Sequence, residues 1–159
     1  MKRKIIIGVL LLFLVIGTVT AADRIQTVQT PTGTTCKLDI GSGLDASQTT
    51  VNEDGQKLVF DAGWYPGTFI STSKENAADV IQDIQATGKK CTADGVTWYH
   101  FADKELTNTW SVFGGTHLKL EDTNEFDVGF LENPNNDEVI ILIAPSNRIV
   151  DCFKTIEWG

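Results

Sequence analysis

The run from Val139 to Ala144 is the feature that most constrains how this chain can fold. It reads VIILIA and follows a turn signal rich in asparagine and proline, 133–137. A strand with one face in solvent alternates between apolar and polar residues, whereas this run is apolar at every position. It therefore predicts a strand in the centre of a sheet.

Other stretches show the period of two that is typical of half-buried strands. In the first of them, Cys36 and Leu38 share one face and Lys37 lies on the other. Gly55 can take a positive φ and predicts a hairpin between the second and third. The predicted strands are 36–40, 49–52, 56–60, 68–71, 96–103, 108–113, 116–121 and 126–131.

Two stretches have helical spacing instead. The capping box Thr72-Ser-Lys-Glu75 and a stop at Gly88 predict a helix over 73–87. A last helix starts at Ser146 and has apolar residues on its inner side, namely Ile149, Val150, Phe153 and Ile156. This order predicts an α+β fold, a twisted antiparallel sheet with two helices packed on it, in a single domain over 36–159.

The N-terminus has the three parts of an export signal: a basic start at 1–4, an apolar stretch at 5–16 and small residues at 17–22. Val19 and Ala21 occupy the −3 and −1 positions of a cleavage site. We expect residues 1–21 to be a signal peptide. The alternative is an N-terminal membrane anchor, because an apolar run that extends to Ala22 reaches the lower limit for a spanning helix.

A Thr- and Gln-rich stretch, 22–35, predicts a short tether between this segment and the domain. Loss of the leader removes three basic residues and leaves 10 basic against 21 acidic residues, a net charge of −11 in place of −8. Nucleic acid and anionic membrane surfaces are therefore not expected as partners, since both require basic patches. Contact with a membrane is expected only through an uncleaved N-terminal segment.

Three cysteines in an exported chain allow one disulfide, or three free thiols if the host lives without oxygen. Cys36 and Cys152 lie on inward faces of their elements, so they are the candidate pair. They are equally consistent with two small buried apolar residues. Cys91, just beyond a helix end, is expected to be the exposed thiol.

Metal and catalytic signatures are weak. Asp122, Asn124 and Asp127 are calcium candidates because their oxygen atoms crowd one turn, although ordinary turns have the same composition. No nucleophile elbow is present, and Cys91 with His100 lacks a motif that would pair them. We expect no catalytic residues and no cofactor.

The loop 61–67 is the one candidate binding element. Trp64 and Tyr65 stand side by side between glycines, and such aromatics can stack on sugar rings or anchor a partner. The alternative is that one of them covers the edge of the core.

The whole pattern resembles the PsbP-like secreted domains that are abundant in methanogenic archaea. A leader precedes a helix reading SKENAADVIQDI, a strand GVTWY, the run VIILIA and a closing helix IVDCFKTIEW. The resemblance implies an accessory role, binding to a larger assembly, and carries over no functional residue.

These observations predict an exported or extracytoplasmic, non-catalytic binding or accessory domain at the cell envelope, with an envelope protein or glycan as its partner. One alternative is a carrier of a small apolar ligand, held in a pocket between sheet and helix. The second alternative is a small extracellular hydrolase.

Overall fold

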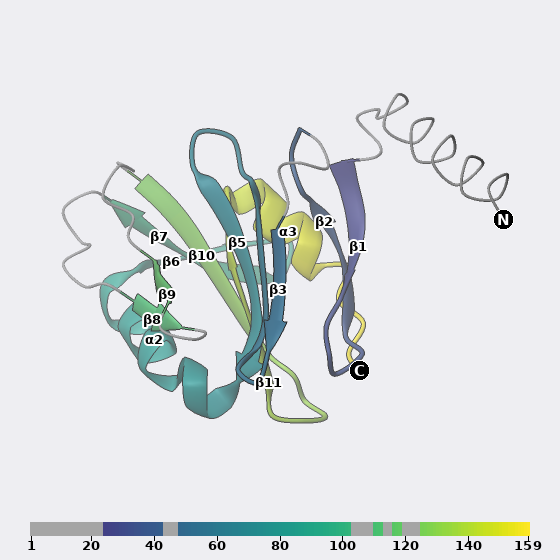
Figure 1. The fold of residues 1–159 in the computed structure, drawn as a ribbon. Helices are drawn as coiled ribbons and strands as arrows, with labels where there is room; N and C mark the ends of the chain where they lie inside the picture. The colour runs from purple at the N-terminus through teal and green to yellow at the C-terminus, as the bar shows by residue number, and fades with distance from the viewer. Residues whose placement is uncertain (1–23, 43–47, 103–109, 113–115, 119–124) are drawn as a thin grey trace, which may run out of the picture.

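The computed structural model describes residues 24–42, 48–102, 110–112, 116–118 and 125–159, and the predicted leader lies outside them. Figure 1 shows the arrangement of the elements. The strands are β1 (Ile25–Gln29), β2 (Thr35–Asp39), β3 (Gln48–Asn52), β4 (Gly55–Asp61), β5 (Pro66–Ser73), β6 (Lys89–Ala93), β7 (Val96–Ala102), β8 (Trp110–Val112), β9 (Thr116–Leu118), β10 (Glu125–Glu132) and β11 (Glu138–Ile143). The helices are α2 (Lys74–Thr87) and α3 (Ser146–Phe153).

Seven strands form one antiparallel sheet in the order β3-β4-β5-β11-β10-β7-β6. β11 lies in the middle, and all six of its residues are buried. The prediction of a central strand is therefore confirmed, and so is the α+β class. β1 with β2 and β8 with β9 form separate two-stranded sheets.

The two helices contact opposite faces of the large sheet. Gly88, at the end of α2, lies against Tyr99 of β7, and a Cβ there would come within 2.8 Å of the Tyr99 Cβ atom. Gly129 of β10 lies under α3, since its Cβ would come within 2.7 Å of Ile149. Tyr99 is in register with Val128, the neighbour of Gly129, and neighbouring residues of a strand face opposite ways. In the described part of the chain, neither helix is both long and apolar enough to span a membrane.

Helix α2 begins one residue later than the capping box predicts. Ser73 is the N-cap and accepts a hydrogen bond from the Asn76 backbone N–H at 3.2 Å. Thr72 is still part of β5, and its hydroxyl donates to the carbonyl of Asp54 at 2.7 Å. Pairing of β5 with β11 extends to Ser73. The Thr72 hydroxyl is therefore bonded within the sheet, and the Ser73 hydroxyl caps the helix.

The segment 22–35, expected to be a tether, contains a strand. Ile25–Gln29 form β1, which pairs along its whole length with β2, and Val28 is buried. The turn that follows buries Thr30 and Thr34. The tether prediction is therefore corrected: the polar composition hides a strand, because β2 provides backbone hydrogen-bond partners and threonine suits extended backbone.

A buried carboxylate joins this hairpin to the large sheet. Glu138 is 3% exposed and accepts hydrogen bonds from the hydroxyls of Thr32, Thr34 and Ser71 at 2.5–2.7 Å and from the Asn133 side-chain amide at 3.1 Å. We call these five residues the Glu138 cluster. Burial opposes ionisation, but the hydroxyl donors outweigh it and lower the pKa of Glu138 to about 2. The cluster therefore holds a negative charge among neutral donors.

Candidate binding site at the turn between β4 and β5

The turn between β4 and β5 carries the two aromatic residues that the sequence indicates. Trp64 is 61% exposed, whereas Tyr65 is 4% exposed. Their rings form a T-shaped pair with an interplanar angle of 74° and centroids 4.7 Å apart. The alternative in which one of the two aromatics covers the core therefore holds for Tyr65, and only Trp64 of the two presents its ring to solvent.

Tyr65 anchors the turn from below. Burial raises the pKa of its phenol, and the nearby Asp127 carboxylate raises that pKa further. The phenol is therefore neutral throughout the physiological range of pH. The backbone carbonyl of Tyr65 accepts a hydrogen bond from the Ala62 N–H at 3.3 Å, which closes the turn.

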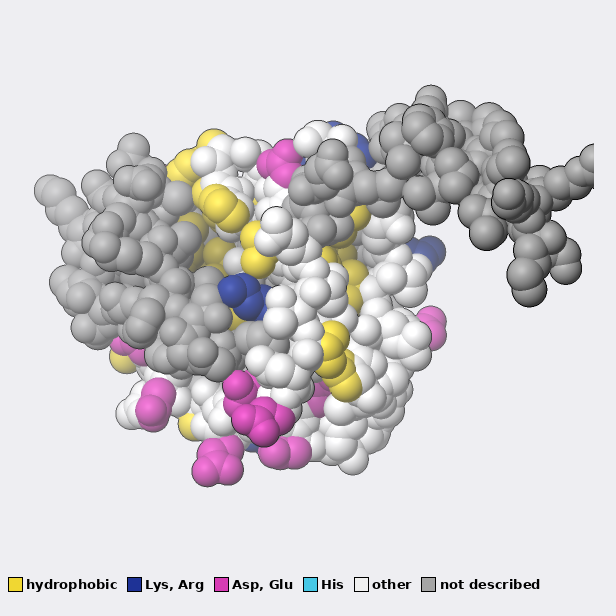
Figure 2. All heavy atoms as spheres, viewed as in Figure 1, with side chains coloured by type: hydrophobic (Ala, Val, Ile, Leu, Met, Phe, Trp, Pro, Cys, Tyr) yellow, Lys and Arg dark blue, Asp and Glu magenta, His cyan; other side chains and the backbone are white. Residues whose placement is uncertain are grey.

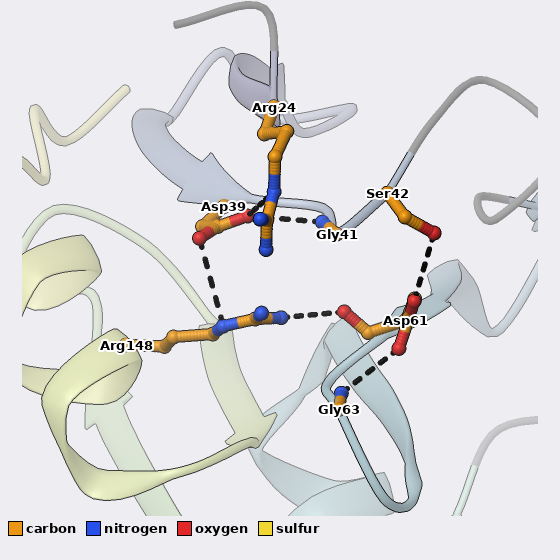
Figure 3. Close-up of polar contacts among 7 residues, drawn as sticks. All are labelled: Arg24, Asp39, Gly41, Ser42, Asp61, Gly63 and Arg148. Atoms are coloured by element: carbon orange, nitrogen blue, oxygen red, sulfur yellow. Dashed lines mark hydrogen bonds and ion pairs between the residues drawn. The ribbon is translucent and has the colours of Figure 1, made fainter. Parts of the chain in front are cut away.

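Asp61 fixes the start of the turn on the other side. One oxygen of its carboxylate accepts from the Gly63 N–H at 2.8 Å, and the other accepts from the Ser42 hydroxyl at 3.0 Å (Figure 3). Both hydrogen bonds lower the pKa of Asp61, and the one from the Gly63 N–H has the larger effect. Gly63 has a φ of +100°, a conformation that side-chain-bearing residues rarely adopt. The backbone around Trp64 is thus held in one conformation.

Arg148 of α3 connects this turn to the hairpin of β1 and β2. Its guanidinium donates to the backbone carbonyl of Asp61, and its Nε atom lies 3.7 Å from the Asp39 carboxylate. Arg24 approaches the same carboxylate from the opposite side at 3.5 Å, as Figure 3 shows. We call Arg24, Asp39, Ser42, Asp61 and Arg148 the Arg148 cluster. Two cations and two carboxylates balance there, so the cluster braces the turn without a net charge of its own.

Two surface hollows flank the cluster. A shallow hollow of about 310 Å³ beside the turn is lined by residues 59–61 and 63–66. A groove of about 380 Å³ between β2 and α3 has lining side chains of both charges, including Lys37, Arg148 and Asp151. Figure 2 shows hydrophobic side chains exposed at the top of the view, near the turn, whereas acidic side chains gather at the opposite end.

The calcium prediction falls mostly outside the described part of the chain and stays a prediction. Asp122 and Asn124 lie outside the described residues. Asp127 accepts a hydrogen bond from the His100 Nδ1–H at 2.8 Å. No group of three or more potential metal ligands occurs among the residues that are described.

His100 is the one histidine whose surroundings are described. Its Nε2 atom lies 3.7 Å from Glu125, so the ring stands between two carboxylates. Cys91 is opposite Trp98, two pairs away from the Lys89–His100 pair of β6 and β7, and its thiol contacts the Lys89 carbonyl at 3.5 Å. A histidine oriented by Asp127 has the form of a general base, but the described contacts give it no nucleophile to activate.

The candidate disulfide partners do meet. Cys36 of β2 and Cys152 of α3 are both buried at the contact between these two elements, and each thiol shifts the pKa of the other, downward for Cys36 and upward for Cys152. They are free thiols in this structure. Cys91 is half-buried.

Sequence reasoning found Trp64 but missed the residues that support it. Asp39, Asp61 and Arg148 are isolated charged residues with no motif around them, and Arg148 lies 87 positions from the carbonyl that it contacts. The only local signal was Asp61 with a glycine two positions later, a composition that is typical of a turn.

Comparisons of this chain with protein-family models, with curated proteins and with solved structures found no match. The resemblance to PsbP-like domains therefore stays a prediction. The arrangement around Trp64 is an exposed aromatic ring on a turn that hydrogen bonds of Asp61 hold in place.

Proposed function

We propose that this chain is an exported, non-catalytic binding domain that attaches to a component of the cell envelope through Trp64. In this proposal the chain is a single domain, in which a twisted sheet with both helices packed on it serves as a rigid support for the turn. Export rests on the leader, 1–21.

One observation carries the proposal: Trp64 is 61% exposed on a turn that the rest of the fold holds in place. Leaving a large apolar side chain in water forgoes roughly 2 kcal/mol of burial. The neighbouring Tyr65 shows that this turn is able to bury an aromatic ring. An exposed tryptophan in a preorganised turn loses little conformational entropy when it binds, which is the property of an anchor residue.

The surroundings indicate the kind of partner. The net charge of −11 without the leader disfavours nucleic acid and other polyanions. Asp61, a hydrogen-bond acceptor, lines the same hollow as Trp64. An aromatic face with a hydrogen-bond acceptor at its edge suits a neutral glycan or a protein surface of the envelope.

The two alternative functions receive less support from the described residues. A carrier of an apolar ligand requires an enclosed apolar cavity, whereas the hollows near the Arg148 and Glu138 clusters are lined by charged and hydroxyl side chains. A hydrolase requires a nucleophile beside His100, and the described contacts of His100 are with Asp127 and Glu125.

The test compares sedimentation of the exported protein with envelopes isolated from its host. Wild type and the variants Trp64→Ala and Val51→Ala are used; Val51 is a matched control because it is an apolar residue with 59% exposure on β3. We expect Trp64→Ala to lower bound protein at least tenfold and Val51→Ala to leave it unchanged. Equal binding by all three proteins would remove Trp64 from the proposal.

The same experiment on pretreated envelopes separates the two kinds of partner. Periodate oxidation destroys vicinal diols of sugars, and protease digestion removes exposed proteins. Loss of binding after periodate alone identifies a glycan, and loss after protease alone identifies a protein. If wild type fails to bind untreated envelopes, the proposed function is wrong.

A further inference from the structure

Cys36 and Cys152 form the only pair of sulfur atoms that the described residues bring together. Cys36 is 2% exposed and Cys152 is 1% exposed, and both lie at the interface where β2 packs against α3, close enough for each thiol to shift the pKa of the other. They lie 116 positions apart along the chain. Their proximity is therefore a product of the tertiary structure and not of local sequence.

The backbone on both sides of this pair is held independently of the sulfur atoms. The Lys37 N–H donates to the Thr155 hydroxyl at 2.8 Å. Thr35 and Glu157 exchange two backbone hydrogen bonds, each 2.9 Å long. The residues before and after Cys36 are thus fastened to the segment that follows Cys152. This keeps the two side chains opposite each other whether or not a bond joins them.

We propose that Cys36 and Cys152 are joined by a disulfide in the exported protein, with Cys91 left as a thiol. The pairing follows from contact, burial and the hydrogen bonds on both sides. Cys91 lies on the edge strand β6, opposite Trp98. The proposal requires export to an oxidising compartment, but it does not depend on binding through Trp64.

The bond forms by thiol–disulfide exchange with an external disulfide, either in a thiol oxidoreductase or in a small molecule. The thiolate of one cysteine attacks a sulfur of that disulfide and forms a mixed disulfide. The second thiolate then displaces the external sulfur and closes the bond. Two electrons pass to the external pair, and the two thiol protons are released to it or to solvent. Both sulfur atoms are buried in the folded chain, so exchange takes place before the interface between β2 and α3 closes.

The bond has a specific structural consequence. The hairpin of β1 and β2 is not part of the seven-stranded sheet. A covalent link from β2 to α3 fastens this hairpin to the domain. It also fixes Asp39, which β2 carries, relative to Arg148, which α3 carries. The disulfide thus secures the support of the turn between β4 and β5.

Peptide mapping tests the proposal directly. Protein is recovered from its host without reductant, free thiols are alkylated with N-ethylmaleimide, and the digest is analysed by mass spectrometry. We expect one linked peptide that contains Cys36 and Cys152, and a Cys91 peptide that carries the alkyl group. Alkylation of all three cysteines overturns the proposal, and so does a linked peptide that contains Cys91.

Thermal unfolding gives a second readout that does not rely on recovery from the host envelope. Reductant is expected to lower the unfolding midpoint of the oxidised protein by roughly 10 °C, because the bond closes a long loop. The same shift is expected for Cys91→Ser, the matched control, whereas a Cys36→Ser and Cys152→Ser double variant no longer responds to reductant. An unchanged midpoint in reduced wild type contradicts the bond. Envelope binding by Trp64 is scored separately, so either proposal can fail without the other.

Discussion

The two ends of the sheet hold carboxylates in opposite ways. At one end, Glu138 is buried among hydroxyl and amide donors, with no cation paired to it in the described part of the chain. At the other end, Asp39 and Asp61 are more exposed and lie beside Arg24 and Arg148. The first arrangement is rigid and inaccessible, and the second supports an exposed side chain. The difference indicates that one end stabilises the fold and the other is available for recognition.

Among the charged residues of the two ends, the largest expected effect is at the Glu138 cluster. Glu138→Ala leaves the hydroxyls of Thr34 and Ser71 buried without their acceptor, so we expect it to lower the free energy of unfolding by about 3 kcal/mol. Urea denaturation followed by circular dichroism measures this. Glu132→Ala, at an exposed position of β10, is the control and should change stability by less than about 0.5 kcal/mol. Equal losses of stability in the two variants would contradict a special stabilising role for Glu138.

Acid should reduce the stabilisation that the Glu138 cluster provides. The pKa of Glu138 is about 2 in the folded chain against an ordinary value of 4.5, so the unfolded chain binds a proton first as pH falls. The stabilisation is complete above about pH 4.5 and is lost between about pH 4.5 and 2, up to about 3 kcal/mol. Stability curves of wild type and Glu138→Gln measured from pH 7 to pH 2 should converge in acid. Curves that stay parallel would show that the pKa of Glu138 is not lowered.

A smaller effect is expected at the Arg148 cluster. Arg148→Ala removes the hydrogen bond to the Asp61 carbonyl and the ion pair with Asp39, and we expect a loss of about 1–2 kcal/mol. It should also weaken envelope binding, because the turn loses its brace. The control is Lys154→Ala, which breaks an exposed ion pair with Asp94 and should cost less than about 0.5 kcal/mol. If Arg148→Ala lowers stability but leaves binding intact, the turn does not depend on this brace.

The smallest effect on stability is expected at Trp64. Trp64→Ala should change the free energy of unfolding by less than about 0.5 kcal/mol, because the indole is exposed, and yet it should abolish binding. Tyr65→Ala is the contrasting variant: it empties a buried site and should cost about 3 kcal/mol or more. Differential scanning calorimetry distinguishes the two. A large loss of stability in Trp64→Ala would make this residue structural.

Local patterns in the sequence were sufficient for much of the fold. The apolar run at 139–144, the helical spacing at 73–87 and the turn at Gly55 are each produced by residues close together in the chain, and the structure contains β11, α2 and the β3–β4 hairpin at these places. The strand β1 was missed because one buried residue, Val28, is too little for a period to show.

The sequence by itself determined the class of fold, the central strand and the location of the aromatic turn, because periodicity and turn chemistry depend on neighbouring residues. Only the tertiary structure decided that Trp64 faces solvent while Tyr65 is buried and that Arg148 braces Asp61. It also decided that hydroxyls from two segments and an amide from a third surround Glu138, and that Cys36 lies near Cys152. These arrangements join residues from distant parts of the chain. Their geometry is set by how the sheet, α3 and the N-terminal hairpin pack together, which no local pattern encodes.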